Sequence, residues 1–165
     1  MNKWQSHVAE FHEATDSTVS EEPEIRDAEL RAKLIMEEAV ETVAALGYSV
    51  YAAIDERAIP GERPHKSVAT FSKTYNDPHL VDFIDGMCDL IYVVCGSAVA
   101  AGVDLDPHFE EVHRANMTKL RGPKREDGKQ LKPADWQPPD HDKHLIRAWN
   151  RIEEWKRLEN AWTRT

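Results

Sequence analysis

Apolar residues recur at helical spacing along most of this chain, and no segment shows the clear alternation of apolar and polar residues that is typical of a half-buried strand. The pattern predicts an all-α fold, a helical bundle in which short links make neighbouring helices antiparallel. The expected helices cover residues 3–14, about 23–46, about 78–101, about 107–116 and 141–165.

Prolines and glycines indicate where these helices begin and end. Pro23, Pro78 and Pro107 each fit a first helical turn, where a missing N–H removes no hydrogen bond. Gly47 and Gly102 fit the left-handed position just beyond a last turn. We therefore expect three helices to start at a proline and two to end at a glycine.

The links between the helices differ in character. Residues 48–57 could form a further helical segment. Residues 59–77 are expected to be a long surface connection, because two prolines and a glycine interrupt residues 59–64. Residues 118–140 are rich in Lys, Gly and Pro and are expected to form an ordered, non-helical strap. The chain is interpreted as a single domain, residues 1–165, with a core over about residues 23–140 and a C-terminal helical extension over residues 141–165.

Composition narrows the class of protein. The formal net charge is −9 and no long basic run is present, so binding to a nucleic-acid backbone is not expected. The longest apolar run, residues 90–103, is interrupted by Gly96 and Ser97 and is too short to span a bilayer, and the N-terminal residues lack an apolar signal core. Cys88 and Cys95 would lie about 10 Å apart on one helix, beyond disulfide reach. These features predict a cytoplasmic protein with reduced thiols.

Acidic residues mark two of the predicted helices. Glu37, Glu38 and Glu41 form a Glu-Glu-x-x-Glu motif, which places the last two on one helical face. A solvated acidic surface is the plain alternative for this motif. Asp85 and Asp89 lie on the most apolar helix, where an Asp on a buried face is costly unless it is paired or binds a metal. A divalent cation shared by both helices explains the two acidic patches together, and Mg²⁺ prefers such carboxylate oxygens.

With these motifs the chain resembles the all-α nucleoside triphosphate pyrophosphohydrolases, the group that includes MazG, dimeric dUTPases and phosphoribosyl-ATP pyrophosphohydrolase. Members of that group carry Glu-x-x-Glu on one helix and Glu-x-x-Asp on the next. Glu38 and Glu41 match the first motif, and Asp89 matches the final Asp of the second. The chain has Gly86 where the second motif begins with Glu, and the neighbouring Asp85 is the expected substitute.

The resemblance is closest to phage-type MazG-like proteins, MazZ-like proteins among them, and covers about residues 30–140. Its further motifs are Ile-Tyr-Val-Val at residues 91–94, Gly-Val-Asp at residues 102–104 and Asn-Met-x-Lys at residues 116–119. By this resemblance Asn116 and Lys119 contact the triphosphate, although Lys and Asn also occur at helix ends for dipole and capping reasons. The further substrate-binding candidates are Lys33, Tyr92 and Trp136. The Trp136 indole could stack on the base, and a core or lid role is the alternative for it.

The resemblance implies hydrolysis of a nucleoside triphosphate between its α and β phosphates, which releases a monophosphate and pyrophosphate. Glu37 or Glu38 is the expected general base. The residues expected to hold Mg²⁺ or Mn²⁺ are Glu38, Glu41, Asp85 and Asp89. A homodimer or homotetramer is expected, as in family members. Guanine substrates, dGTP or GTP, are favoured slightly over dUTP or dCTP.

Two other classes of protein compete with this interpretation. A di-iron carboxylate bundle needs Glu-x-x-His on two helices, and the chain has Ala44 and Tyr92 at those places. A non-catalytic helical interaction module, whose acidic faces serve as docking surfaces, is the second alternative. Saturable binding of Mn²⁺ would separate the enzyme from such a module.

Overall fold

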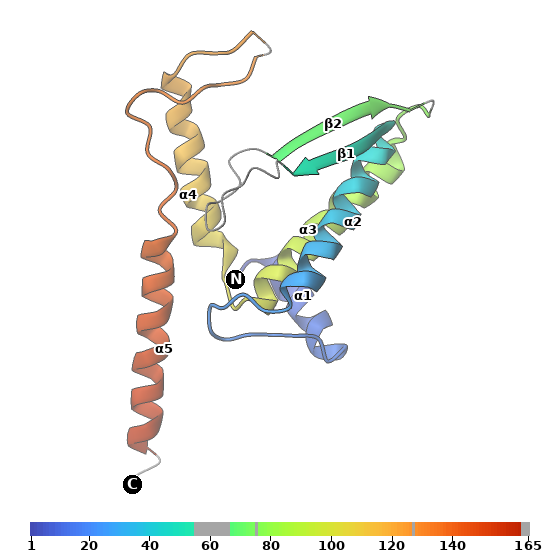
Figure 1. Cartoon of the computed structure of the whole chain (residues 1–165). Coiled ribbons are helices and arrows are strands. Elements are labelled where there is room, and N and C mark those ends of the chain that lie inside the picture. The colour runs from blue at the N-terminus through green and yellow to red at the C-terminus, as the bar shows by residue number, and fades with distance from the viewer. Residues whose placement is uncertain (55–66, 75, 127, 163–165) are drawn as a thin grey trace. The chain divides into compact units, whose positions relative to one another are not determined.

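Helices make up most of the computed structural model, which describes residues 1–54, 67–74, 76–126 and 128–162. The predicted helical class is confirmed, and a small two-stranded sheet accompanies the helices (Figure 1). The elements are α1 (Lys3–Ala14), α2 (Ala28–Ala45), β1 (Tyr48–Ile54), β2 (Ser67–Lys73), α3 (Leu80–Ala100), α4 (Leu105–Thr118), the short 3-10 helix η1 (Lys119–Arg121) and α5 (Asp142–Trp162).

Backbone contacts group the chain into two units. One unit comprises Met1–Arg26 together with Cys95–Thr165, and the other comprises Asp27–Val94. Helix α3 belongs to both, because the boundary falls within it. The four carboxylates of the predicted metal site and the candidate base Glu37 lie in the second unit, whereas Asn116 and the strap lie in the first.

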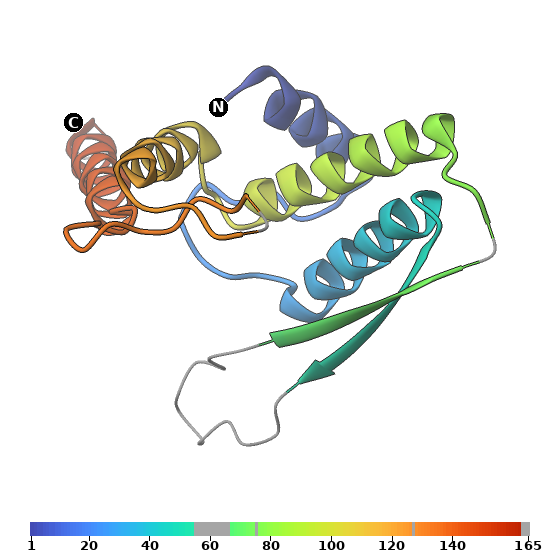
Figure 2. The same cartoon turned by 90° about the horizontal axis from the view of Figure 1, so that it is seen from above.

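Helices α2 and α3 lie side by side in the second unit and touch where Thr42 faces Gly86 (Figures 1 and 2). Both residues are buried. A Cβ atom on Gly86 would lie 2.8 Å from the Thr42 Oγ1 and 3.0 Å from its Cα, closer than side chains normally approach. The Thr42 hydroxyl donates a hydrogen bond of 2.6 Å to the Glu38 carbonyl, which links this contact to the acidic motif one turn earlier. Glycine is therefore required at this point by the closeness of the two helices.

A β-hairpin follows α2 and corrects two predictions for the links. Strand β1 pairs antiparallel with β2, with Tyr48 opposite Lys73. The prediction of a helix over residues 48–57 is wrong for β1, and the prediction of an irregular connection over residues 59–77 is wrong for β2. The interrupted part, residues 59–64, lies outside the described residues. Aromatic and β-branched residues in both strands favour extended backbone, and contacts between β1 and α2 add tertiary support that no local pattern shows.

Three helices begin later or earlier than their prolines indicate. Helix α2 starts at Ala28 and not near Pro23, because the preceding segment is extended and hydrogen-bonded to the end of α3. The Glu24 amide donates to the Ala101 carbonyl at 3.0 Å, and the Ser20 amide donates to the Val99 carbonyl at 3.1 Å. Helix α3 starts two residues after Pro78, and α4 starts two residues before Pro107. The predicted glycine ends are confirmed, since Gly47 and Gly102 have φ angles of +80° and +63°.

In the first unit, α1 covers exactly the predicted residues 3–14 and buries a partly polar face. The Gln5 side chain is fully buried, donates to the Val103 carbonyl and accepts from the Leu105 amide, each at 2.9 Å. It thereby satisfies the backbone of the turn between α3 and α4. Of the three apolar residues that recur at helical spacing in α1, Val8 is 1% exposed, whereas Trp4 and Phe11 are 59% and 51% exposed. The buried face is therefore offset from the one that the periodicity indicates.

Helix α3 is the most apolar element of the described part. The apolar second half of α3, residues 91–101, is expected to be buried. Burial holds for Cys95, Ala98, Val99 and Ala100 but not for Ile91, which is 41% exposed. By length and composition alone, α3 is the one helix among the described residues that is long and apolar enough to cross a bilayer, so the prediction that this apolar segment is too short is wrong. The central helix of a soluble protein meets the same criterion, so the absence of a membrane partner stays a prediction. Both cysteines are free, as predicted, and burial raises the pKa of the Cys95 thiol.

Candidate functional site

The acidic cluster consists of Glu37, Glu38 and Glu41 on α2 and Asp85 and Asp89 on α3. Glu38 is half-buried, and the other four side chains are exposed. Burial, followed by the negative charges of the other four, raises the pKa of the Glu38 carboxyl above its ordinary value. The structure therefore brings all five predicted carboxylates into one electrostatic neighbourhood.

This cluster has an unbalanced negative charge. Within the described residues, none of its five carboxylates forms an ion pair with Lys, Arg or His. An all-oxygen donor set with excess negative charge fits Mg²⁺ or Mn²⁺. In the described part of the chain, no three His, Cys, Asp or Glu side chains already stand close enough together to hold one ion.

Gly86 explains where the chain departs from the resembled motif. A Glu at this position would project into the contact between α2 and α3, where even a Cβ atom lies within 3.0 Å of Thr42. The second helix can therefore present its acidic side chains only from positions beside the contact, which Asp85 and Asp89 occupy. The substitution of Asp85 for the missing Glu stays a prediction.

Two substrate-binding candidates lie in the same unit as the acidic cluster. Lys33 is exposed on α2, one turn before Glu37, and Tyr92 is 40% exposed on α3, three residues beyond Asp89. Helical spacing places each of them near one end of the cluster. Their roles toward a substrate stay predictions.

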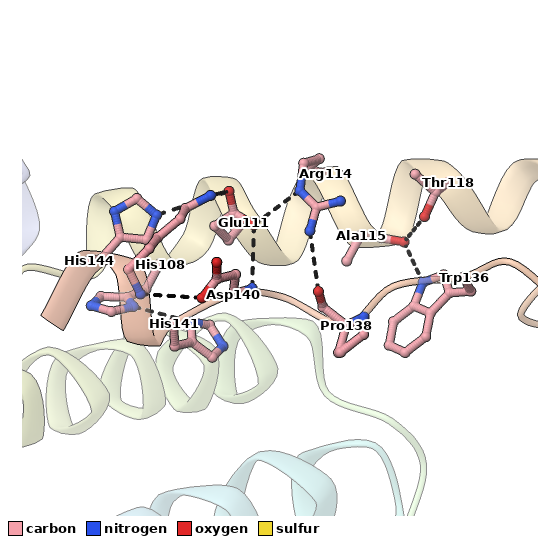
Figure 3. Close-up of polar contacts among 11 residues, drawn as sticks. His108, Glu111, Arg114, Ala115, Thr118, Trp136, Pro138, Asp140, His141 and His144 are labelled. Carbon is pink, nitrogen blue, oxygen red and sulfur yellow. Dashed lines mark hydrogen bonds and ion pairs between the residues drawn. The ribbon is translucent and has the colours of Figure 1, made fainter. Parts of the chain in front are cut away.

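The three remaining candidates come together at the C-terminal end of α4. The Lys119 ammonium donates a hydrogen bond of 2.7 Å to the Asn116 side chain. The Trp136 indole N–H donates to the Ala115 carbonyl at 2.8 Å, which fastens the strap to α4 (Figure 3). The ammonium groups of Lys132 and Lys119 lie 3.8 Å and 5.7 Å from the centre of the Trp136 ring. The Trp136 ring thus forms cation–π contacts with both lysines and helps to hold Lys119 in place.

Glu111 was not among the predicted site residues, although the structure makes it the fastening point of the strap. Its carboxylate accepts hydrogen bonds from the Lys143 ammonium, from the Arg114 Nε at 3.0 Å and from the Asp140 amide at 3.4 Å (Figure 3). The hydrogen bond from Lys143, opposed by burial and reinforced by Arg114, lowers the pKa of Glu111 to about 2. Only the i, i+3 spacing of Glu111 and Arg114 could have indicated this group from the sequence.

The lowered pKa of Glu111 predicts a specific pH dependence of stability. A depressed carboxyl pKa stabilises the folded state above the ordinary value of 4.5, and this contribution is lost as the pH falls toward about 2. We expect Glu111→Gln to lower the free energy of unfolding at pH 7, and the difference from the native chain to shrink between pH 4.5 and pH 2. Urea unfolding over this range measures both. Glu110→Gln, on the exposed neighbour, is the control, and a deficit that is constant with pH would contradict the assignment.

The helical fold and its acidic cluster have the features of the all-α nucleotide pyrophosphohydrolases. A family model described as phosphoribosyl-ATP pyrophosphohydrolase matches residues 8–116, well over half of the chain. The chain belongs to this family, within the MazG-like all-α superfamily, and is thereby a pyrophosphohydrolase acting on acid anhydrides. A search of curated proteins finds no match. The matched region contains the whole acidic cluster and ends at Asn116, so Lys119, the strap and α5 lie beyond it.

Proposed function

We propose that this protein hydrolyses a nucleoside triphosphate between the α and β phosphates and releases a nucleoside monophosphate and pyrophosphate. The observation that carries the proposal is the acidic cluster: five carboxylates from two adjoining helices, without a basic partner among the described residues, in a chain of the pyrophosphohydrolase family. A divalent cation would relieve the repulsion that helps to raise the pKa of Glu38.

Glu38, Glu41, Asp85 and Asp89 would hold the metal ion or ions, Mg²⁺ or Mn²⁺. When bound, the metal supplies positive charge to the phosphates and makes a water molecule easier to deprotonate. The carboxylates of the cluster would fix the metal between α2 and α3, close to the contact of Thr42 with Gly86.

Proton transfer falls to Glu37 or Glu38. Hydrolysis needs a base that accepts a proton from the attacking water while the bond between the α phosphorus and the bridging oxygen breaks. In the metal-free chain, burial and the neighbouring carboxylates raise the pKa of Glu38, so its carboxylate takes up a proton more readily than an ordinary Glu. Glu37 is the alternative, because it is exposed beside the cluster and would be left free if Glu38 binds metal.

Lysines and neighbouring polar residues would bind the substrate. Lys119 and Asn116 would steady the departing pyrophosphate, since an ammonium on a flexible stem suits a phosphate tail. The lysine contacts of Trp136 support a role in placing Lys119 over a role in stacking on the base. Lys33 and Tyr92 are the further proposed substrate contacts.

The assembly is proposed to be a homodimer or homotetramer of a cytoplasmic protein. Large apolar side chains are exposed on α3 and α5, among them Ile84 at 48%, Trp149 at 41% and Trp155 at 64%. Burial of such residues between subunits would be favourable. In this proposal the protein binds neither nucleic acid nor a membrane.

Guanine nucleotides, dGTP or GTP, are the proposed substrates, with dUTP or dCTP as the alternative. The Asn-Met-x-Lys motif at the end of α4 supports a phage-type, MazZ-like subclass. The family's description adds phosphoribosyl-ATP as a further substrate to examine. Pyrophosphate release with Mg²⁺ is therefore predicted to be fastest for dGTP or GTP in a panel of all ribo- and deoxyribonucleoside triphosphates together with phosphoribosyl-ATP.

A panel without pyrophosphate release from any compound would contradict the proposed reaction. Titration calorimetry with Mn²⁺ then separates the two remaining possibilities. Saturable binding that is lost in Asp89→Ala would keep the metal assignment, whereas an absence of saturable binding would favour the non-catalytic interaction module.

A further inference from the structure

The first unit contains a cavity that the proposed reaction does not use. It has a volume of about 450 Å³ and lies between the turn after α3, the start of α4 and the first half of α5. Its lining includes Asp104, His108, His144, Arg147 and Arg151. Neither the acidic cluster nor the group around Trp136 contributes to it. The volume is within the range of small-molecule sites.

The walls of this cavity offer positive charge. Arg147 and Arg151 lie one turn apart on α5, both are exposed, and within the described residues neither forms an ion pair. The one acidic side chain in the lining, Asp104, pairs with the amino group of Met1 at 2.8 Å, and the charge of Arg151 acts on it more weakly, without an ion pair. In a chain of net charge −9, two available guanidinium groups on one cavity wall favour an anionic ligand.

Two histidines and an asparagine add hydrogen-bonding groups to the lining. The His108 and His144 rings lie with their centres 5.4 Å apart, one on α4 and one on α5 (Figure 3). Burial, followed by the neighbouring His141 and His144, lowers the pKa of His108. Asn150 adds a side-chain amide. The two arginines would supply the charge that attracts a ligand, and the histidine rings and the amide would add hydrogen bonds.

We propose that this cavity binds a small phosphate-bearing anion at a site separate from the acidic cluster. Guanidinium groups pair with phosphate oxygens through two parallel hydrogen bonds, and two arginines one turn apart can contact neighbouring phosphate oxygens. Pyrophosphate and a nucleoside monophosphate share this chemistry, and both fit the cavity volume. A site of this kind would let a phosphorylated compound bind without the divalent metal that the acidic cluster needs.

Titration calorimetry on the full chain tests the site in EDTA, with pyrophosphate and dGMP as separate probes. We expect saturable binding of at least one probe to the native protein and about tenfold or greater weakening in Arg147→Ala/Arg151→Ala, because charge-assisted hydrogen bonds are lost. Arg157→Ala, on the same helix outside the cavity, is the matched control and should bind like the native chain. The probe that binds more tightly identifies the source of the phosphate.

Several results would overturn the proposal. One is no saturable binding of either probe, and another is equal affinity in the double variant. A third is loss of binding in Glu41→Gln, which would move the ligand to the acidic cluster. Sedimentation of the same variants distinguishes an interface role, since a changed assembly mass without binding would assign the arginines to a subunit contact. Failure of pyrophosphate release in the substrate panel would leave this binding test unaffected.

Discussion

Glu41→Gln is expected to abolish pyrophosphate release while leaving the far-UV circular dichroism unchanged. Glu41 is exposed on α2, so the amide fits the same space and the helix keeps its packing. The change removes one negative charge from the acidic cluster that is proposed to hold the metal. We expect a loss of roughly a hundredfold or more, because even the second-layer partners of metal ligands contribute ten- to hundredfold. Pyrophosphate release at saturating Mg²⁺ measures the effect.

The matched control for this change is Glu29→Gln, which makes the same substitution on an exposed residue in the first turn of α2. It should retain native turnover. Glu38→Ala and Asp89→Ala should behave like Glu41→Gln, since all three remove carboxylates from one cluster. Native turnover in Glu41→Gln would refute the metal assignment, and loss of turnover together with helical signal would point to a folding defect.

Gly86→Ala is expected to destabilise the chain by about 1–3 kcal/mol, the usual range for extra atoms forced into a packed contact. The added Cβ would lie 2.8 Å from the Thr42 Oγ1 and 3.0 Å from the Thr42 Cα. The second distance involves backbone, so rotation of a side chain cannot relieve it and the helices must move apart. Gly86→Glu, which restores the resembled motif, should destabilise at least as much and should not raise activity.

Urea unfolding of Gly86→Ala, Thr42→Ala and the double variant measures this contact through a double-mutant cycle. The double variant should recover part of the loss, because the closest atom, Thr42 Oγ1, is then absent. Cys88→Ala, two residues along α3 and exposed, is the control. An effect of Gly86→Ala no larger than that of the control would show that the helices accommodate a side chain here.

Local sequence rules were sufficient for the presence of the helices, for most of their C-terminal ends and for the spacing of the carboxylates along each helix. Helix α1 has the predicted bounds, and α2 and α3 end at the predicted glycines. Helical spacing alone placed Glu38 and Glu41 on one face of α2. The negative charge of Glu41 contributes to the raised pKa of Glu38, which agrees with that placement. These features depend on residues within a turn or two of each other, which is the range that a periodic pattern describes.

Long-range contacts decided the features that the pattern missed. Extended residues before α2 hydrogen-bond to the end of α3, and this interaction outweighs the helix-start signal at Pro23. Strand β1 depends on a partner about twenty residues away in the chain and on packing against α2. Glu111 accepts hydrogen bonds from α4, from the strap and from α5, and the most distant donor lies about thirty residues along the chain.

The sequence by itself determined the helical class, most helix ends and which carboxylates could act together, because local backbone preferences and side-chain spacing govern these properties. Only the tertiary structure decided that Gly86 is needed at a contact between helices, that Glu111 fastens the strap, and that Arg147 and Arg151 line a cavity. Each of these depends on atoms from distant segments meeting within a few ångströms. Distances of that kind are set by packing, and no periodicity along the chain encodes them.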